Sequence, residues 1–526
     1  MSIESQNELT GKAKPGIQKR RRQKTAIPRR RLDGSQAVFF QSVPFWIWVL
    51  VGVGVVWAIF TPNPVLTVSS LLLLPLLTGL LWFRGAPPVL LFACCIQWLQ
   101  AATGIFYCNF LNVPLSTGLD LGGSRVEEAT YLSLVGVLVL AVGMRMALIR
   151  WNRRQVQQAQ AEARSLQAGR LFVIYLITFA FSTAIRSIAA TIPRLTQPLL
   201  AFDTIRWVML FLLVYSVLIN RRPYVLLGLA IGLELLVGFI GFFAGFKSSF
   251  FILLIALAGT GVALKGWRLF QFIIVAAFLF VFCILWTTVK PEYRDYLNQG
   301  TGQQVVNVPI KQRLDKLGEL TRSLNAAKFE NGFELLLQRI SYVDYFALTI
   351  QNVPANIPYE RGELWWGAIK QVFMPRLFFP NKPVLDDSAR TSYYTGLRVA
   401  GAEQGTSIGI GYMGESYIDF GPVGMFAPIF LLGLFYGSIY RLFITHSPRK
   451  IIGVAIAVSI LAFGAYEIET SNIKLLGGSV VVCVAMILFL KFGATPVWKA
   501  IASPYERPPN QRPRSHRKPK DGNAEG

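Results

Sequence analysis

Two carboxylates in the segment 402–424, Glu415 and Asp419, have a spacing and a position suited to acid–base chemistry at a membrane boundary. They are four residues apart, so a helix places both on one face. The segment, AEQGTSIGIGYMGESYIDFGPVG, leads into the apolar run Met425–Tyr440. A carboxylate at the mouth of a membrane helix is costly unless it faces water, a partner or a substrate. Glu415 is therefore predicted to be a base or to orient a catalytic arginine, whereas Asp419, before Phe420-Gly421-Pro422, is expected to cap the following helix.

Basic residues also recur near the ends of the apolar segments. Arginine offers a planar, bidentate fork to phosphate, and lysine offers a point charge. The cations in question are Arg186, Arg194, Arg206, Lys247, Arg339, Arg376 and Lys382. As a set they predict an anionic ligand such as a diphosphate. The alternative for each is an ion pair with a carboxylate such as Asp203, Asp344 or Glu415, or a side chain that snorkels to lipid headgroups. Glu234, alone in an apolar segment, is read equally as structural or as pore-facing.

The composition indicates an integral membrane protein. Of 526 residues, 53% are hydrophobic and only 15% are charged, too few for the surface of a soluble protein of this length. A spanning helix needs about 20 mostly apolar residues. Twelve segments qualify, at 44–61, 65–83, 88–111, 131–149, 171–191, 203–220, 223–246, 248–264, 269–289, 422–441, 451–467 and 473–491. The predicted fold is therefore an all-α polytopic membrane protein with about twelve spans.

The distribution of charge predicts the orientation. If both tails are cytoplasmic, the inner segments hold 32 basic and 7 acidic residues, a difference of +25 that matches the net charge of +24 almost completely. This asymmetry follows the positive-inside rule. It places the long segment after residue 289 outside and both histidines, His446 and His516, inside. The outer face then lacks a histidine base or zinc ligand. The dispersed basic residues form no nucleic-acid motif, so nucleic acid is not expected as a partner; the tails are expected to touch membrane lipids.

The chain divides into two tails, two sets of spans and one large outer segment. The predicted boundaries are 1–43, 44–289, 290–421, 422–491 and 492–526. The outer segment is too long for a simple connection. Its apolar spacing predicts two amphipathic helices within Lys311–Gln338, and paired tryptophans predict a surface helix over Trp365–Met374.

A resemblance follows from two motifs. The stretch MPRLFFPNKP (Met374–Pro383) and the later GIGYMGESYIDFGPVGMF resemble the Pro-Arg…Pro-x-Lys-Pro and Gly-Glu…Phe-Gly…Gly stretches of Wzy-type O-antigen and exopolysaccharide polymerases. The match covers residues 374–425, and the topology extends it loosely over the chain. The family positions fall on Arg376, Lys382 and Glu415.

The resemblance implies a C-type glycosyltransferase-like fold in the bacterial inner membrane. Its implied reaction joins undecaprenyl-diphosphate-linked oligosaccharide repeat units on the outer face, in company with a flippase and a chain-length regulator. Glu415, Arg376 and Arg339 are the expected catalytic residues. The expected substrate-binding residues are Lys382, Arg186, Lys247, Arg206 and Asp419. The sequence carries no outer Asp-x-Asp motif, so neither a metal nor a cofactor is expected.

Two other classes remain open. A lipid-linked oligosaccharide flippase has a similar number of spans and buried charges, but it does not need a large outer segment. The O-antigen ligase family shares the topology but is associated with an outer-face histidine, which this chain lacks on the predicted outer face.

Overall fold

The computed structural model describes residues 40–503 apart from short gaps. The gaps are 119–122, 150, 153, 193–194, 222, 241–246, 262–265, 302–307, 375–378, 380–381, 383–384 and 402–405. The described residues form helices joined by turns, and no β-strand occurs among them. The all-α expectation is thus confirmed for this part of the chain.

Each predicted span coincides with a helix. These helices are α1 (Phe45–Ala58), α2 (Pro64–Leu81), α3 (Val89–Phe110), α5 (Val126–Ala147), α7 (Ala168–Thr191), α8 (Thr196–Asn220), α9 (Tyr224–Ile240), α10 (Lys247–Gly259), α11 (Trp267–Asn298), α18 (Phe426–His446), α19 (Lys450–Gly464) and α20 (Asn472–Leu488). Short elements lie between or after them: α4 (Leu115–Gly118), the 3-10 turn η2 (Gly123–Arg125), α6 (Arg154–Arg164), the π-helix η4 (Phe489–Gly493) and α21 (Ala494–Ile501).

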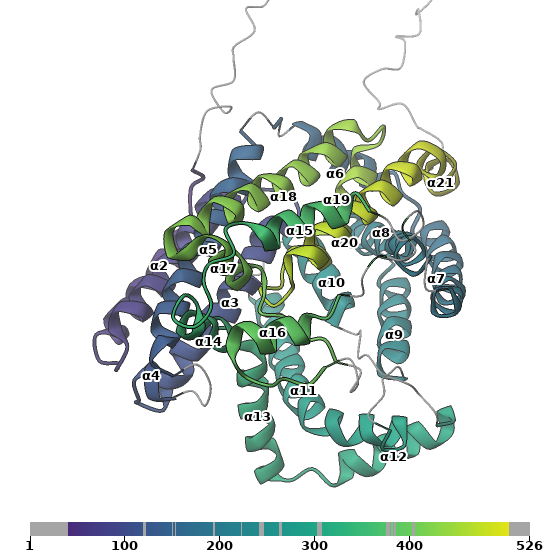
Figure 1. The fold of residues 1–526 in the computed structure, drawn as a ribbon. Coiled ribbons are helices and arrows are strands. Elements are labelled where there is room, and N and C mark those ends of the chain that lie inside the picture. The colour runs from purple at the N-terminus through teal and green to yellow at the C-terminus, as the bar shows by residue number, and fades with distance from the viewer. Residues whose placement is uncertain are drawn as a thin grey trace, which may run out of the picture. The chain divides into compact units, whose positions relative to one another are not determined.

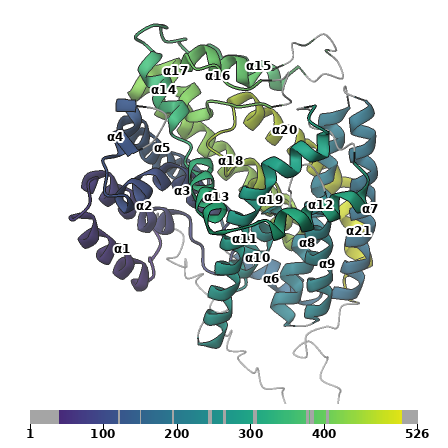
Figure 2. The same cartoon turned by 90° about the horizontal axis from the view of Figure 1, so that it is seen from below.

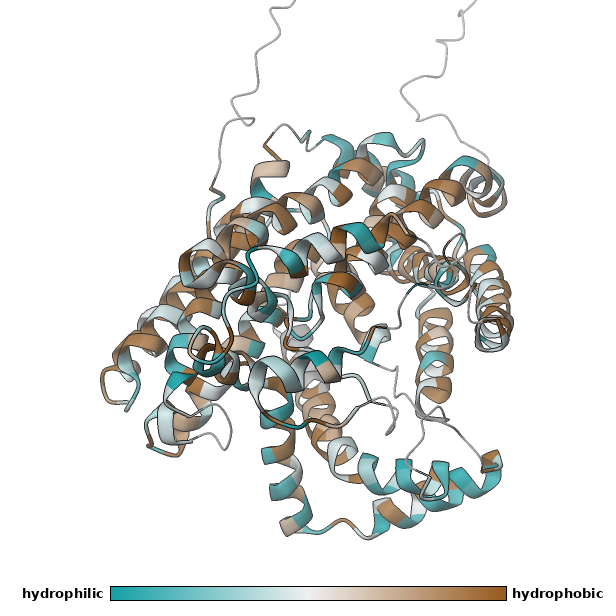
Figure 3. Ribbon diagram, in the orientation of Figure 1, coloured by the Kyte–Doolittle hydropathy of each residue, from teal (hydrophilic) through white to brown (hydrophobic). Residues whose placement is uncertain are grey.

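Seven of the described helical segments have the length and apolar composition to cross a membrane. They are Pro64–Leu81, Val89–Phe110, Gly123–Ala147, Ala168–Ala189, Thr196–Asn220, Phe426–His446 and Asn472–Ile501. The apolar helices α1, α9, α10 and α19 are shorter. Figure 3 shows the hydrophobic character of the helix bundle beside the more polar α12 (Ile310–Arg322). These features indicate a membrane protein and establish seven candidate spans, fewer than the twelve predicted.

Glycines allow two membrane helices to pack closely. A Cβ atom on Gly143 of α5 would collide with the backbone of α18, and one on Gly433 or Gly437 would collide with the backbone of α5. Gly433 and Gly437 are four residues apart on one face of α18. Small residues at this spacing let helix backbones approach, which favours dispersion contacts where no hydrophobic effect operates. The contact between α5 and α18 thus joins the C-terminal part of the chain to its first half.

The segment predicted to lie outside folds into helices that pack against the bundle. They are α12, α13 (Ala326–Ile340), α14 (Asp344–Asn352), α15 (Glu363–Val372), α16 (Asp387–Thr395) and α17 (Tyr412–Gly424). The predicted amphipathic pair corresponds to α12 and α13, and the predicted surface helix to α15. Helix α13 packs on α3, α14 on α5 and α15 on α20 (Figures 1 and 2). The segment therefore covers the ends of spanning helices.

Candidate functional site

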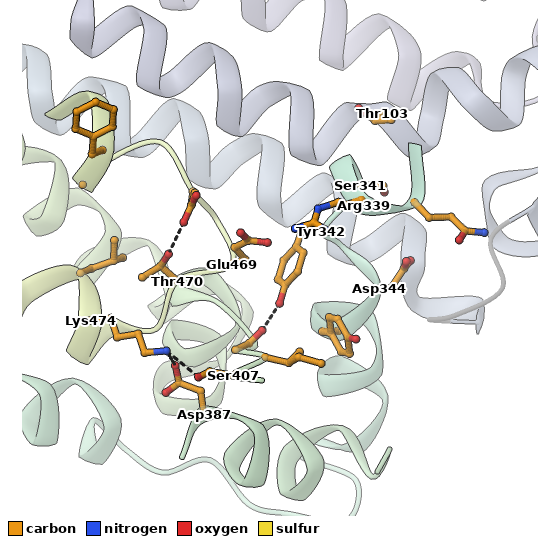
Figure 4. A pocket seen from close by; sticks show the side chains of 18 of the residues that line it. Thr103, Arg339, Ser341, Tyr342, Asp344, Asp387, Ser407, Glu469, Thr470 and Lys474 are labelled. Atoms are coloured by element: carbon orange, nitrogen blue, oxygen red, sulfur yellow. Dashed lines mark hydrogen bonds and ion pairs between the residues drawn. The ribbon is translucent and has the colours of Figure 1, made fainter. Parts of the chain in front are cut away.

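A cavity of about 1210 Å³ opens where the segment that forms α12–α17 meets the ends of α3, α19 and α20. Its wall combines polar, charged and apolar residues. The polar and charged residues that line it are Thr103, Tyr107, Thr204, Glu334, Gln338, Arg339, Ser341, Tyr342, Asp344, Tyr345, Asp387, Ser407, Ser459, Glu467, Glu469, Thr470, Lys474 and Ser479. Several of them are drawn in Figure 4. Charged groups of both signs thus converge on one space at the end of the bundle.

Positive charge gathers around one lining residue of the cavity, Arg339. Arg339, at the end of α13, lines the cavity directly. Burial, followed by repulsion from Arg339, Arg294 and Lys247, lowers the pKa of Lys290 to about 7. Cations that repel one another and lower one another's pKa in this way are stabilised by an anion placed among them. Lys247, the first residue of α10, also pairs with Glu467 at 3.6 Å.

A loop of the cavity wall between α19 and α20 carries two glutamates. The Glu467 side chain accepts a hydrogen bond from the Thr470 hydroxyl at 3.2 Å in addition to its pair with Lys247. Glu469 is half-buried, and burial, followed by repulsion from Glu467, raises its pKa. Lys247 and Arg339 act on Glu469 in the opposite direction. The carboxylate therefore lies within electrostatic reach of the cations of the cavity.

A second cation lies on the α20 side. The Lys474 ammonium lies 2.7 Å from Asp387 Oδ2 and donates to the Ser407 hydroxyl at 2.8 Å (Figure 4). The Ser471 hydroxyl also donates to Asp387 Oδ2, at 3.2 Å. Asp387 is only 3% exposed, whereas Lys474 is 44% exposed. The buried carboxylate thus holds a solvent-accessible ammonium group in the cavity wall.

Of the surroundings expected for Glu415, the structure shows a partner, Arg390, rather than an open cleft. Glu415 is 1% exposed. Its Oε1 accepts from the Arg390 guanidinium at 2.9 Å, and its Oε2 accepts from the backbone N–H of Asn472 at 2.8 Å. Burial raises the pKa of Glu415, while Arg390 lowers it. Glu415 thus joins α17, α16 and the first turn of α20, with both oxygens occupied.

Asp419 caps a helix, but not the one that follows it. Its Oδ1 and Oδ2 accept from the backbone N–H groups of Leu364 and Trp365, at 3.0 and 2.8 Å. These groups belong to the first turn of α15, where unsatisfied donors and the helix dipole favour a carboxylate. Gly421, with φ of 71°, interrupts the helical geometry of α17. This break ends the turn that presents Asp419 to α15.

Other expected ligand residues are engaged within the fold. The Lys382 ammonium donates to the carbonyl oxygens of Gln371 and Met374 at the end of α15. Arg186 pairs with Asp203 at 2.6 Å. Arg206, which is 5% exposed, pairs with Glu234 at 3.5 Å. The alternative of internal ion pairing therefore describes Arg186 and Arg206, and Glu234 is buried rather than pore-facing. Arg376 and Arg194 lie outside the described residues.

The structure gathers a different set of residues from the one expected. Of the predicted residues, Arg339 lines the cavity and Lys247 lies beside it. Asp387, Glu469 and Lys474 were not selected from the sequence. A signal for the last two was available, because Glu467, Glu469 and Lys474 place three charges at and between the facing ends of the apolar segments 451–467 and 473–491, where charges are costly without a partner.

Comparison with known protein families gives a match over most of the chain. The profile of a family described as a domain of unknown function, DUF8712, matches residues 88–489. The matched part contains the spans from α3 onward, the covering helices and all the residues of the cavity wall. The chain matches no curated protein and no solved structure.

Proposed function

This chain is a member of the DUF8712 family, and we propose that it polymerises undecaprenyl-diphosphate-linked oligosaccharide repeat units on the outer face of the bacterial inner membrane. The observation that carries the proposal is the polar cavity of about 1210 Å³ at the ends of apolar helices. It exceeds the roughly 300–1,000 Å³ of common small-molecule sites. A space of this size, with a charged wall beside a bundle of membrane helices, suits a glycan attached to a lipid.

The cations of the cavity suit the leaving group of glycosyl transfer. Cleavage of the bond between the sugar and the diphosphate leaves negative charge on the diphosphate, which preorganised donors stabilise. Arg339 is placed to donate from the wall, and Lys290, Arg294 and Lys247 add positive potential around it. Burial and, to a smaller extent, these cations lower the pKa of Lys290, and a dianion nearby would favour its charged form.

Carboxylates and hydroxyls of the same wall suit the glycan. Sugar hydroxyls bind to paired donors and acceptors, and the cavity offers Ser341, Tyr342, Ser407 and Thr470 beside its carboxylates. Glu415 takes a positioning role in this proposal. By holding Arg390 and the start of α20, it fixes the element that carries Lys474.

The proposed orientation places both termini in the cytoplasm and α12–α17 outside. It rests on the asymmetry of basic residues, which lie mainly in the tails and the predicted inner loops. Single cysteines at Gln303 and Asn510, in a variant without the five native cysteines, test it. An impermeant thiol reagent should label the first in cells whose outer membrane has been permeabilised. Labelling of the second would overturn the orientation.

The reaction is tested with purified protein in liposomes that contain lipid-linked oligosaccharides extracted from cells lacking this chain. The expected result is a ladder of longer lipid-linked glycans, with release of undecaprenyl diphosphate. Movement of the oligosaccharide across the bilayer without any lengthening would overturn the proposal in favour of a flippase. Transfer only to added lipid A core would overturn it in favour of a ligase.

A further inference from the structure

We propose that Glu469 is the catalytic base of this reaction, the carboxylate that takes the proton from the acceptor hydroxyl. The inference rests on the proposed glycosyl transfer and names a residue within that site. It is carried by the position of Glu469 on the cavity wall and by the absence of any hydrogen-bond donor to its carboxylate among the described residues.

Glu469 differs from Glu467 and Asp387, two other carboxylates that line the cavity. Figure 4 draws it between Thr470 and Tyr342, and no marked interaction reaches it. Glu467, two residues earlier, is engaged by Lys247 and Thr470. Asp387 is engaged by Lys474 and is almost fully buried. A base needs a lone pair that a substrate can reach and a setting that is partly shielded from water. Half-buried Glu469 meets both requirements, whereas Glu334, which also lines the cavity, is exposed.

The backbone that carries Glu469 is held in place on both sides. The Ile468 N–H donates to Gln100 Oε1 at 3.1 Å, which ties the loop to α3. A Cβ atom on Gly409 would press on the Glu469 carbonyl oxygen, and one on Gly411, where φ is 93°, would collide with that of Ile468. This close contact requires glycine at positions 409 and 411 of the facing segment. The carboxylate thus extends from a fixed loop rather than a free one.

The electrostatics of the site agree with this role. Burial and Glu467 raise the pKa of Glu469 above its usual range, which strengthens it as a base toward a hydroxyl. Lys247 and Arg339 limit the increase. Tyr342, whose hydroxyl donates to the Gly409 carbonyl oxygen, also feels the charge of Glu469. One cavity therefore contains both a base and the cations suited to a diphosphate.

The step balances without a further reactant. The acceptor hydroxyl oxygen forms a bond to the anomeric carbon of the donor, and the bond from that carbon to the diphosphate oxygen breaks. The electron pair of the broken bond leaves with the diphosphate, which Arg339 faces. The hydroxyl proton passes to the Glu469 carboxylate and then to water.

Glu469→Gln tests the inference, because it keeps the shape of the side chain and removes its basicity. The chain-lengthening rate should fall by about 10²–10⁴-fold. Binding of undecaprenyl diphosphate, measured separately by isothermal titration calorimetry, should stay equal or become tighter, because a negative charge near the anion is lost. Glu330→Gln, an exposed carboxylate on α13 outside the cavity, is the matched control and should keep the wild-type rate.

A pH profile separates catalysis from a structural role. The wild-type rate should fall on the acid side with a midpoint above that of an ordinary glutamate, as the raised pKa requires. Glu469→Asp should fold and retain this acid limb at a lower rate, because its shorter carboxylate is displaced.

Three outcomes would overturn the assignment: a Glu469→Gln rate within twofold of wild type, loss of undecaprenyl diphosphate binding together with the rate, or a Glu469→Asp profile without the acid limb. If the wild type itself fails to lengthen glycans, the proposed function fails instead. The two failures are therefore distinguishable.

Discussion

The carboxylates of α17 and the glutamate at position 469 do opposite work. Glu415 and Asp419 have all four carboxylate oxygens occupied by donors from α15, α16 and α20. Glu469 faces a cavity and accepts from no described donor. When a carboxylate accepts hydrogen bonds from several helices at once, its substitution lowers the stability of the fold. A carboxylate that accepts none from the protein is available to a ligand. Acidic residues of a motif can therefore build a site without facing its substrate.

The largest expected effect is on stability, at Glu415. Glu415→Gln removes one charge of a buried pair and leaves Arg390 uncompensated, at a cost of about 3–5 kcal/mol. Thermal denaturation in detergent should show a clear decrease in the midpoint. The rate per folded molecule, measured after size-exclusion chromatography, should fall much less than it does for Glu469→Gln.

A double-mutant cycle sharpens this prediction. Arg390→Met alone leaves Glu415 buried without its cation, so it should also destabilise strongly. The double variant Glu415→Gln, Arg390→Met should lose less stability than the sum of the losses in the two single variants. Each single variant leaves one buried charge without its partner, whereas the double variant removes both charges. A fully stable Glu415→Gln protein with no turnover would restore Glu415 as the base and contradict the comparison.

Arg339 should show the next largest effect, on ligand affinity. Arg339→Ala removes a donor from the cavity wall, worth about 1.5–3 kcal/mol to a charged partner, so undecaprenyl diphosphate should bind about 10–100-fold more weakly. Arg339→Lys should restore part of the affinity, since it keeps the charge but loses the planar fork. Arg322→Ala, on the exposed side of α12, is the control. If Arg339→Ala bound undecaprenyl diphosphate as tightly as the wild type, Arg339 would not be a diphosphate ligand.

Asp419 should show a smaller effect, again on stability. Asp419→Asn keeps one acceptor oxygen for the first turn of α15 and loses the other, and the loss of a helix cap typically costs about 0.5–2 kcal/mol. The denaturation midpoint should fall modestly, with the rate per folded molecule unchanged. A loss of rate in a protein of wild-type stability would place Asp419 in the chemistry.

The sequence predicts the helices of this chain far better than the contacts of its charges. Apolar length predicts where the helices lie: each of the twelve predicted segments coincides with a helix, although seven of the described helices have the length and composition to cross a membrane. Asp419 is four residues from Glu415 in the chain, but its partners are Leu364 and Trp365, which no local spacing relates to it. The roles of Asp387 and Lys474 likewise exist only because α16 meets α20. Cavity-facing groups depend on such tertiary contacts, which one-dimensional patterns do not contain.

The smallest predicted effect is a pH dependence of affinity, which probes Lys290 and the cations around it. Lys290 has a pKa of about 7 in the free protein, so it is largely charged at pH 6 and largely neutral at pH 8. A bound diphosphate favours the charged form and raises this pKa, so binding takes up a proton above pH 7. Affinity for undecaprenyl diphosphate should therefore fall as pH rises from 6 to 8, by at most about tenfold per pH unit.

Lys290→Arg, which stays charged, should flatten the dependence of affinity on pH. Because Glu469 also titrates, Glu469→Gln serves as the second control and should keep the slope above pH 7. Equal slopes in wild type and Lys290→Arg would show that Lys290 does not sense the anion, and the comparison would then rest on Arg339 and Glu469 alone.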